Sequence, residues 1–196
     1  IGHKDRPLFA DISFDICEGD VILLCGANGS GKTTLLKALT EIRSEVEIAM
    51  IPTRIPKIKG FTLIEFINLS CYNKQNADSD KALKKLALSH LADRDISTLS
   101  DGEFQKGTIA AAIAKGAEII LMDEPTAFLD TENRRNVLST LRKLCEETGT
   151  AVIFSSHDLY EALETCNKVI ALGADRQCHI SSENLKDTIS AIFSKD

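Results

Sequence analysis

Short apolar runs alternate with helical patterns along most of the chain, and this alternation predicts a mainly parallel α/β sheet. Each apolar run has the length and composition of a strand that is buried on both faces. Five runs fit this description: Val21–Cys25, Ile48–Ile51, Ile119–Met122, Ala151–Phe154 and Val169–Leu172. We expect them to form the centre of the sheet.

Ahead of the first run, apolar and more polar residues alternate singly. The apolar positions are Leu8, Ala10, Ile12, Phe14 and Ile16. A period of two indicates a half-buried strand, which is typical of antiparallel pairing. The sequence therefore predicts an N-terminal antiparallel portion beside the parallel sheet. Because the chain opens on Ile1 rather than on methionine, we also expect further residues before it.

The helical patterns fall into two groups. Within the α/β part, helices are expected over Thr34–Leu39 and over Asn133–Glu147, the second with its apolar residues on one stripe. Between residues 61 and 116 the pattern contains helices only, with helices expected over Lys81–Leu91 and Glu103–Lys115. This stretch therefore differs in kind from the rest of the chain.

Two capping boxes open helices in the same stretch. Thr62 stands three residues before Glu65, and Ser100 stands three residues before Glu103, which is the spacing that satisfies two helix N-terminal donors reciprocally. We expect a single domain over residues 1–196. Its α/β core covers residues 1–60 and 117–196, and an all-helical subdomain covers residues 61–116.

Composition narrows the class of protein. The chain has 196 residues, with 43% hydrophobic and 27% charged, as in an ordinary globular domain. Its formal net charge of −6 argues against a nucleic-acid partner, because phosphate binding needs a basic face. No apolar run approaches about 18 residues, so the sequence predicts no membrane-spanning helix.

The chain has six cysteines without a CxxC pair. They are Cys17, Cys25, Cys71, Cys145, Cys166 and Cys178. Several lie inside apolar runs, which favours small buried hydrophobic residues in a reducing compartment over a zinc site or a disulfide framework.

A glycine-rich loop follows the strand expected over Val21–Cys25. The segment Gly26–Thr33 reads GANGSGKT, which fits the pattern GxxxxGK[ST] of a phosphate-binding loop. Lys32 is expected to reach the β- and γ-phosphates, and the Thr33 hydroxyl to bind Mg²⁺. The expected nucleotide-binding residues are Gly26, Asn28, Gly29, Ser30, Gly31, Lys32, Thr33 and Thr34.

Acidic residues end a second expected strand. Asp123 and Glu124 follow Ile119–Met122, and ligands of open α/β sheets bind at the carboxyl edge of the strands. We expect Asp123 to hold the Mg²⁺ shell and Glu124 to polarise the attacking water. His157 follows the next strand and is expected to bind the γ-phosphate, with Lys32 as the third catalytic group.

A third motif assigns the type of nucleotide hydrolase. Leu99–Glu103 reads LSDGE and resembles the signature of ABC ATPases, usually written LSGGQ. Ala127–Asp130 resembles the D-loop of that family, and His157 its H-loop. These motifs occur in family order from Gly26 to His157, which is most of the chain. The sequence is therefore similar to the nucleotide-binding subunits of ABC transporters.

The resemblance implies the fold, the cofactors and a shared site. The implied fold is the P-loop NTPase core of ABC type, with ATP and Mg²⁺ bound between two copies of the chain. The signature residues Ser100, Asp101, Gly102 and Glu103 would act across the dimer, together with Asp130 of the D-loop. His3 takes the place of the aromatic residue that stacks on adenine, and Thr53 takes the place of the Q-loop glutamine.

Two shorter stretches resemble a subgroup. LSDGE followed by Gln105–Lys106, and DEPTAFLD over Asp123–Asp130, are similar to the ATPases of iron-chelate importers, which serve siderophores, haem or cobalamin. That likeness implies a homodimer on ATP binding, integral-membrane permease subunits and a periplasmic or surface substrate-binding protein. It implies a peripheral location on the cytoplasmic face of the inner membrane.

Two other functions stay open at this point. One is a soluble ABC ATPase without a permease, of the iron–sulfur assembly type. The other is a nucleotide-gated regulatory subunit that barely hydrolyses ATP. The second is motivated by Thr53 and by Asp101, which puts a carboxylate where the signature has glycine.

Overall fold

The computed structural model of the chain describes residues 2–3, 6–7, 12–42, 45–72, 74, 77–173 and 177–193, with side chains described from residue 12 to residue 190. The central feature is a six-stranded sheet in the order β4-β5-β6-β3-β7-β8. All neighbouring strands are parallel except β7 and β8. The strands are β3 (Val21–Gly26), β4 (Ile48–Ile51), β5 (Ile119–Met122), β6 (Ala151–Ser155), β7 (Lys168–Leu172) and β8 (Cys178–Ser181). The mainly parallel α/β sheet is thus confirmed, and the five predicted runs form its five parallel strands.

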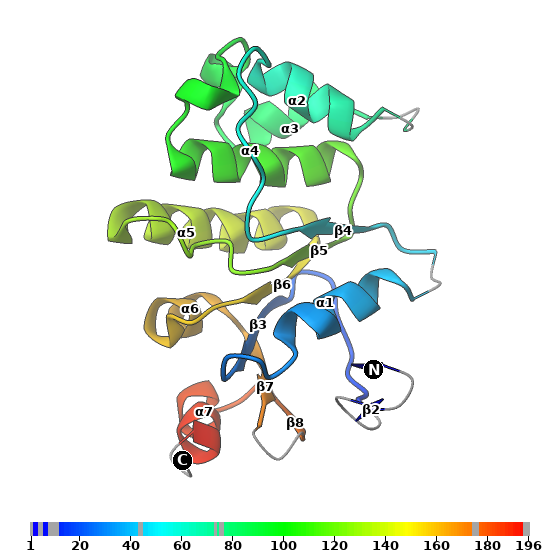
Figure 1. Cartoon of the computed structure of the whole chain (residues 1–196), viewed down its shortest axis with the longest axis vertical. Coiled ribbons are helices and arrows are strands. Elements are labelled where there is room, and N and C mark those ends of the chain that lie inside the picture. Colours follow the sequence, from blue (N-terminus) through cyan, green and yellow to red (C-terminus); the bar gives the residue numbers. More distant parts are fainter. Residues whose placement is uncertain are drawn as a thin grey trace.

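Helices cover both faces of this sheet (Figure 1). Ile22 and Leu24 of β3 pack in one apolar cluster with Leu35 and Leu36 of α1 (Lys32–Thr40). Residues 21, 23 and 25 of the same strand point to the other face, where the cluster contains apolar residues of α5 (Thr131–Thr148) and α6 (Leu159–Thr165). Because both faces are covered, the strands read as continuous apolar runs.

The chain between β4 and β5 forms helices only among the residues described. They are α2 (Leu63–Ser70), α3 (Ser79–Lys85), the 3₁₀ turns η1 (Ser89–Leu91) and η2 (Ile96–Thr98), and α4 (Asp101–Ala114). These helices gather at one end of the molecule, at the top of Figure 1. Both capping boxes are present, with Thr62 and Ser100 as the capping residues of α2 and α4.

The helix expected over Lys81–Leu91 is shorter than predicted. It ends at Lys85, and Ala87 adopts a left-handed backbone with φ of 56°. The backbone N–H of Leu88 then donates to the carbonyl of Leu83 at 2.8 Å, which closes the helix in the way that glycine usually does. Burial of Leu83 and Leu88 favours this turn despite the alanine.

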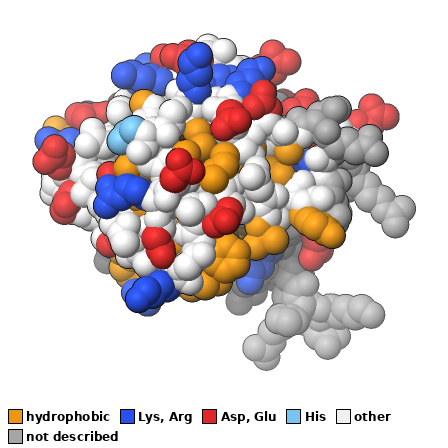
Figure 2. Space-filling model, turned by 90° about the horizontal axis from the view of Figure 1, so that it is seen from above, with side chains coloured by type: hydrophobic (Ala, Val, Ile, Leu, Met, Phe, Trp, Pro, Cys, Tyr) orange, Lys and Arg blue, Asp and Glu red, His pale blue; other side chains and the backbone are white. Residues whose placement is uncertain are grey.

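The surface of the helical end mixes charges with apolar groups. Figure 2 shows acidic and basic side chains on this face with apolar side chains between them. Phe61, Leu69 and Tyr72 are exposed large apolar residues of this part of the chain. Among the residues described, no helix is both long and apolar enough to span a bilayer.

The N-terminal region differs from its prediction. Residues 12–16 form no strand, although Ile12, Phe14 and Ile16 are half-buried against the cluster beneath α1. Leu8 and Ala10 lie outside the described residues. An antiparallel pair is nevertheless present, formed by β1 (Gly2–His3) and β2 (Arg6–Pro7).

Three elements near the C-terminus were not predicted. They are α6, β8 and α7 (Leu185–Phe193). In β8 every residue is half-buried or exposed, because the strand lies at the edge of the sheet and pairs only with β7 among the described strands. Its short, partly polar sequence carries no apolar run from which a strand could be predicted.

The six cysteines are free thiols. Four of them are buried as predicted, and two are not: Cys25, Cys71, Cys145 and Cys166 are buried, Cys178 is half-buried and Cys17 is exposed. Burial raises the pKa of Cys25 and Cys145 to about 12. These two thiols therefore stay protonated at neutral pH and serve as packing groups.

Candidate nucleotide site

The phosphate loop lies between the end of β3 and the start of α1. Gly29 and Gly31 have φ of 77° and 99°, a backbone conformation that side chains rarely adopt. Lys32 is buried, and its ammonium donates to the carbonyls of Gly26 at 2.8 Å and Ala27 at 3.1 Å. The backbone of the loop therefore surrounds the Lys32 ammonium.

Several observations on this loop fit a bound phosphate. Gly31 offers no side chain to cap α1, and the first turn of α1 holds no acidic residue, so its positive end lacks compensation. The Ser30 hydroxyl is buried without a hydrogen-bond partner. A Cβ at Gly26 would lie 2.5 Å from that hydroxyl and 3.0 Å from the Leu172 carbonyl oxygen. Phosphate oxygens would supply the missing acceptors.

A chain of hydrogen bonds links the loop to the acidic strand end. The Thr33 hydroxyl donates to Asp123 Oδ2 at 2.8 Å, and the Ser155 hydroxyl donates to Asp123 Oδ1 at 2.9 Å. Ser155 Oγ in turn accepts from the backbone N–H of Glu124 at 2.8 Å. Asp123 and Ser155 are both buried. The structure thus brings together Thr33 and Asp123, the two residues expected to bind Mg²⁺.

The donor set around Asp123 also fits that ion. Mg²⁺ in phosphate-transfer sites takes one or two protein oxygens together with oxygens of the substrate phosphates. Thr33 and Asp123 offer a hydroxyl and a carboxylate side by side. Among the residues described, no group of three or more His, Cys, Asp or Glu side chains could hold a metal alone. Oxygens of a bound nucleotide would complete the coordination of the ion.

Glu124 has an unusual backbone. Its φ is 50°, in the left-handed region where non-glycine residues are uncommon and are concentrated at functional sites. Its Oε1 lies 2.6 Å from His157 Nε2, and the two side chains are 24% and 50% exposed. Both therefore remain accessible to water and ligand. The two residues expected to act on water and on the γ-phosphate are in contact.

The Ser155 contribution was missed by the sequence interpretation. Ser155 is the last residue of β6, immediately before Ser156 and His157. A serine at the carboxyl edge of a strand next to an acidic strand end is a weak signal, because the pairing of β5 with β6 cannot be deduced from spacing alone. Its full burial marks it as part of the site.

The signature residues start helix α4. The Ser100 hydroxyl accepts from the Glu103 backbone N–H at 3.1 Å, and Glu103 Oε2 accepts from the Ser100 N–H at 2.8 Å. Asp101 forms an ion pair of 2.6 Å with Lys57, whose ammonium also donates to the Leu99 carbonyl. The charge of Asp101, a departure from the family signature, is thus balanced within the chain.

The signature and the phosphate loop lie on different parts of the molecule. Over the described part of the chain, no hydrogen bond or ion pair joins Ser100–Glu103 to Gly26–Thr33. Gly102 instead packs against α5, where an added Cβ would lie 2.6 Å from Asn133 Oδ1. Asp130 caps α5 by accepting from the Asn133 backbone N–H at 2.8 Å.

The structure places the side chain of Thr53 but does not describe that of His3. Thr53 is half-buried and lines, with Glu124 and Phe128, a groove of about 550 Å³ between the helical end and the strand edge. The Arg54 guanidinium lies 4.0 Å from the Phe128 ring centroid across this groove. His3 belongs to β1, but its side chain is outside the described part of the structure.

Comparison with known proteins decides the family. The family model described as ABC transporter matches residues 9–127, which include the phosphate loop, the signature and the Asp123–Glu124 pair. The chain belongs to the ABC transporter family. It is an ATPase domain of that family and binds ATP.

Curated relatives of this ABC ATPase carry several substrate names. The iron(3+)-hydroxamate import ATP-binding protein FhuC of Bacillus subtilis is 30% identical, covering 88% of this chain and 76% of the relative. The molybdate import ATP-binding protein MolC of Haemophilus influenzae is also 30% identical, covering 97% and 83%. A zinc import ATP-binding protein, ZnuC of Cereibacter sphaeroides, is 29% identical, covering 87% and 75%.

Solved structures agree on the fold of this ABC ATPase. A metal-chelate type ABC transporter in an inward-facing conformation superposes with a TM-score of 0.83 at 28% identity, covering 95% of this chain and 82% of the other. CbiO1 of Clostridium perfringens, part of the ABC transporter complex CbiONQ, has a TM-score of 0.82 at 19% identity and covers 100% and 93%. The second likeness shows the fold alone.

Proposed function

We propose that this ABC ATPase is the ATP-hydrolysing subunit of an importer of iron-chelate type, acting as a homodimer with Mg²⁺. The observation that supports hydrolysis most strongly is the hydrogen-bonded chain from Thr33 through Asp123 and Ser155 to Glu124. It connects the residues that would hold the metal with the backbone of the residue whose carboxylate would act on water. Nucleotide binding and hydrolysis then share one rigid edge of the sheet.

The phosphate loop would bind the nucleotide. Lys32 would exchange its two carbonyl acceptors for the β- and γ-phosphate oxygens, and the unpartnered Ser30 hydroxyl and the N-terminal N–H groups of α1 would donate to the same anion. Thr33 and Asp123 would hold Mg²⁺, which when bound offsets negative charge on the phosphate oxygens.

Glu124 would act on the attacking water. Its carboxylate contacts the His157 imidazole, and its backbone N–H donates to the Ser155 hydroxyl. A carboxylate held in this way accepts a hydrogen bond from water and orients it toward the γ-phosphate. His157 would also donate to the γ-phosphate, where negative charge is concentrated during transfer.

The separation of the signature from the phosphate loop favours a shared site. Ser100 and Gly102 lie at the start of α4, and no described contact brings them to Lys32 in the same chain. In a two-fold dimer, the signature of one copy would face the phosphate loop of the other. Each ATP would then lie between two chains.

The importer assignment rests on the relatives. FhuC is named for iron(3+)-hydroxamate import, and CbrD of Dickeya dadantii, 28% identical, is named for achromobactin transport. Zinc and molybdate importers match at similar identity. The LSDGE and DEPTAFLD stretches favour the iron-chelate type. We therefore propose permease subunits and a periplasmic or surface substrate-binding protein as partners, and a peripheral position at the cytoplasmic face of the inner membrane.

Uptake measurements in the source organism test this proposal. A strain lacking the chain would be supplied with labelled ferric hydroxamate, zinc or molybdate, and complemented with the parent or with Glu124→Gln. We expect only ferric-chelate uptake to be lost and only the parent to restore it. Loss of zinc or molybdate uptake instead would contradict the substrate, and unaffected uptake of all three would favour an ABC ATPase without a permease.

A further inference from the structure

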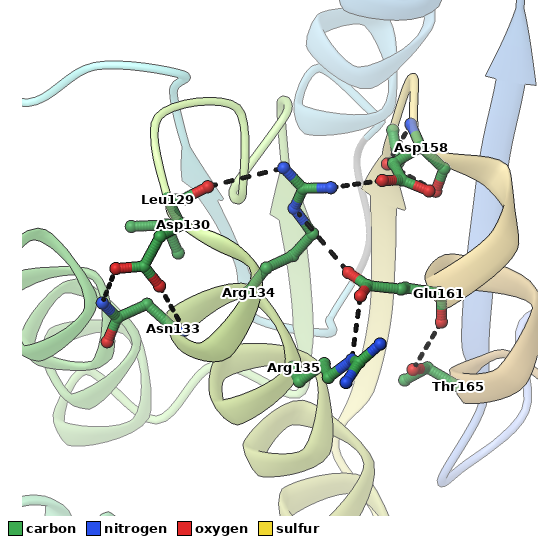
Figure 3. Close-up of polar contacts among 9 residues, drawn as sticks. Leu129, Asp130, Asn133, Arg134, Arg135, Asp158, Glu161 and Thr165 are labelled. Carbon is green, nitrogen blue, oxygen red and sulfur yellow. Dashed lines mark hydrogen bonds and ion pairs between the residues drawn. The ribbon is translucent and has the colours of Figure 1, made fainter.

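Arg134 links α5 to the loop before it and to the start of α6 (Figure 3). It lies in the first turn of α5, and its guanidinium forms an ion pair with Asp158, the residue directly after His157. Its Nη2 donates to the Leu129 carbonyl at 3.4 Å, and its Nε lies 3.8 Å from Glu161 Oε2 in the first turn of α6. One planar cation thus contacts the loop before α5 and the start of α6.

The position of this arginine is unfavourable for α5 itself. A cation in the first turn of a helix opposes the positive end of the helix dipole. Asp158 and Glu161 stand at the start of α6, where negative charge is favoured, and the Arg134 side chain is only 23% exposed between them. Arg134 therefore contributes through its contacts with Asp158 and Glu161 at the start of α6, and not by stabilising its own helix α5.

The backbone around His157 is held on both sides. The Ser156 hydroxyl donates to the Asp158 carbonyl at 3.1 Å and accepts from the Asp158 backbone N–H at 3.1 Å, so residues 156–158 form a closed turn. Arg134 fixes the side chain at the far end of that turn. The His157 imidazole projects from it to Glu124 at 2.6 Å.

We infer that Arg134 is a positioning residue for ATP hydrolysis. By holding Asp158 it fixes the turn that aims His157 at Glu124, and through the Leu129 carbonyl it couples that turn to the loop ending at Asp130. Arg134 itself does not contact Glu124 among the bonds described, so its effect passes through His157. The inference rests on the proposed roles of His157 and Glu124.

Arg135 provides a matched control. It is the next residue of α5, carries the same charge and also pairs with Glu161, at 2.9 Å, but is 68% exposed. It forms no described bond with Asp158 or Leu129. Substituting either arginine by methionine therefore removes one charge and one contact with Glu161, and only the Arg134 change releases the His157 turn.

Steady-state hydrolysis compares the two variants. Arg134→Met is expected to lower kcat about tenfold with KM for ATP within about twofold, because the phosphate loop is untouched and only transition-state positioning is lost. Arg135→Met is expected to leave both constants within about twofold. Arg134→Lys should recover only part of the loss, since an ammonium cannot span Asp158 and Leu129 as the planar fork does.

A double-variant test asks whether Arg134 acts through His157. In the background of His157→Ala, measured in single-turnover reactions, Arg134→Met should have no further effect on the rate. An independent tenfold loss in that background would overturn the inference, because the effects of substitutions at residues that act through one another are not additive.

If Arg134→Met does not fold, Asp158→Asn removes the same ion pair at constant shape and should reproduce the loss of kcat. An unchanged kcat in Asp158→Asn would overturn the inference.

A nucleotide-free measurement separates this inference from the proposed function. The chain has four histidines, so the imidazole resonance of His157 can be assigned by its loss in His157→Gln. We expect this resonance to move in Arg134→Met and not in Arg135→Met. An unmoved resonance together with equal kcat values overturns the inference. A moved resonance with equal kcat values supports positioning by Arg134 and instead contradicts the role of His157 in the proposed function.

Discussion

Thr33 donates a hydrogen bond of 2.8 Å to Asp123, although 90 positions separate them in sequence and β6 lies between their strands in the sheet. Ser155, at the end of β6, binds the other oxygen of the same carboxylate. The carboxyl ends of three adjacent strands therefore bring Thr33, Asp123 and Ser155 into a single, partly buried hydrogen-bond chain. A substitution at any one of these residues should therefore alter the hydrogen bonds of the others.

Ser155→Ala tests this chain directly. The substitution removes the hydroxyl that binds Asp123 and leaves the Glu124 N–H without its acceptor, so kcat should fall while KM for ATP changes little. Unfolding should become easier by about 1–3 kcal/mol, the usual effect of an unsatisfied buried group. Ser139→Ala, on the exposed face of α5, is the control and should change neither value. Equal kcat in the two variants would remove Ser155 from the site.

A mixing experiment tests whether the site is shared between two chains. Lys32→Ala removes the phosphate cation, and Ser100→Arg blocks the start of α4, so each variant alone should be inactive. In a mixed dimer one site collects both changes and the other collects neither. With half of the dimers mixed and independent sites, about a quarter of the parental activity should return.

The mixing experiment requires a control that shows that mixed dimers form. Differently tagged variants captured together supply that proof. No recovery in captured mixed dimers would favour a site within one chain or strict coupling of the two sites. Activity in either variant alone would show that Lys32 or Ser100 lacks the role proposed for it.

The stability of the fold should fall at acid pH because of Asp20, which directly precedes β3 at the amino edge of the sheet. Burial tends to raise the pKa of Asp20, but hydrogen bonds from Lys168 and from the Cys17 and Asn167 groups outweigh it and hold that pKa below its ordinary value. A carboxylate with a lowered folded-state pKa stabilises the fold above its unfolded pKa of about 4, and this stabilisation is lost as pH falls through the folded pKa.

Lys168→Met tests the contribution of the ion pair between Lys168 and Asp20. It leaves the buried Asp20 carboxylate without its cation and should lower the free energy of unfolding by about 3 kcal/mol at pH 7. Below the pKa of Asp20 the carboxyl is neutral, so parent and variant should converge as pH falls. Urea unfolding at pH 7 and pH 3 measures both values. Lys143→Met, on the exposed side of α5, controls for the change in charge; an equal effect of both variants would contradict the account.

The parts of the fold that could be predicted are those dictated by local pattern. Val21–Cys25 and the other four runs are apolar throughout because helices cover both faces of the sheet, and Thr62 and Ser100 cap helices through side chains only three residues away. The turn at Ala87 was not predictable from local pattern, since burial of Leu83 and Leu88 selects it over a continuing helix.

The site divides in the same way. The glycines and Lys32 of the phosphate loop act within eight consecutive positions, so their pattern identifies them. Ser155, Lys57 and Arg134 act through partners from 24 to 44 positions away, and their ordinary residue types carry no local signal. The order of strands brings Ser155 to Asp123, the position of the segment after β4 beside the start of α4 brings Lys57 to Asp101, and the packing of α5 on α6 brings Arg134 to Asp158.

Turnover and nucleotide binding measured together on Glu124→Gln test the central claim most directly. The amide keeps the shape of the side chain and leaves Lys32, Thr33 and Asp123 in place, but it cannot polarise water as a carboxylate does. We predict that steady-state phosphate release falls at least about a hundredfold, that ATP still binds with parental affinity, and that ATP with Mg²⁺ accumulates a dimer. Phosphate release near the parental rate from this variant would contradict the account.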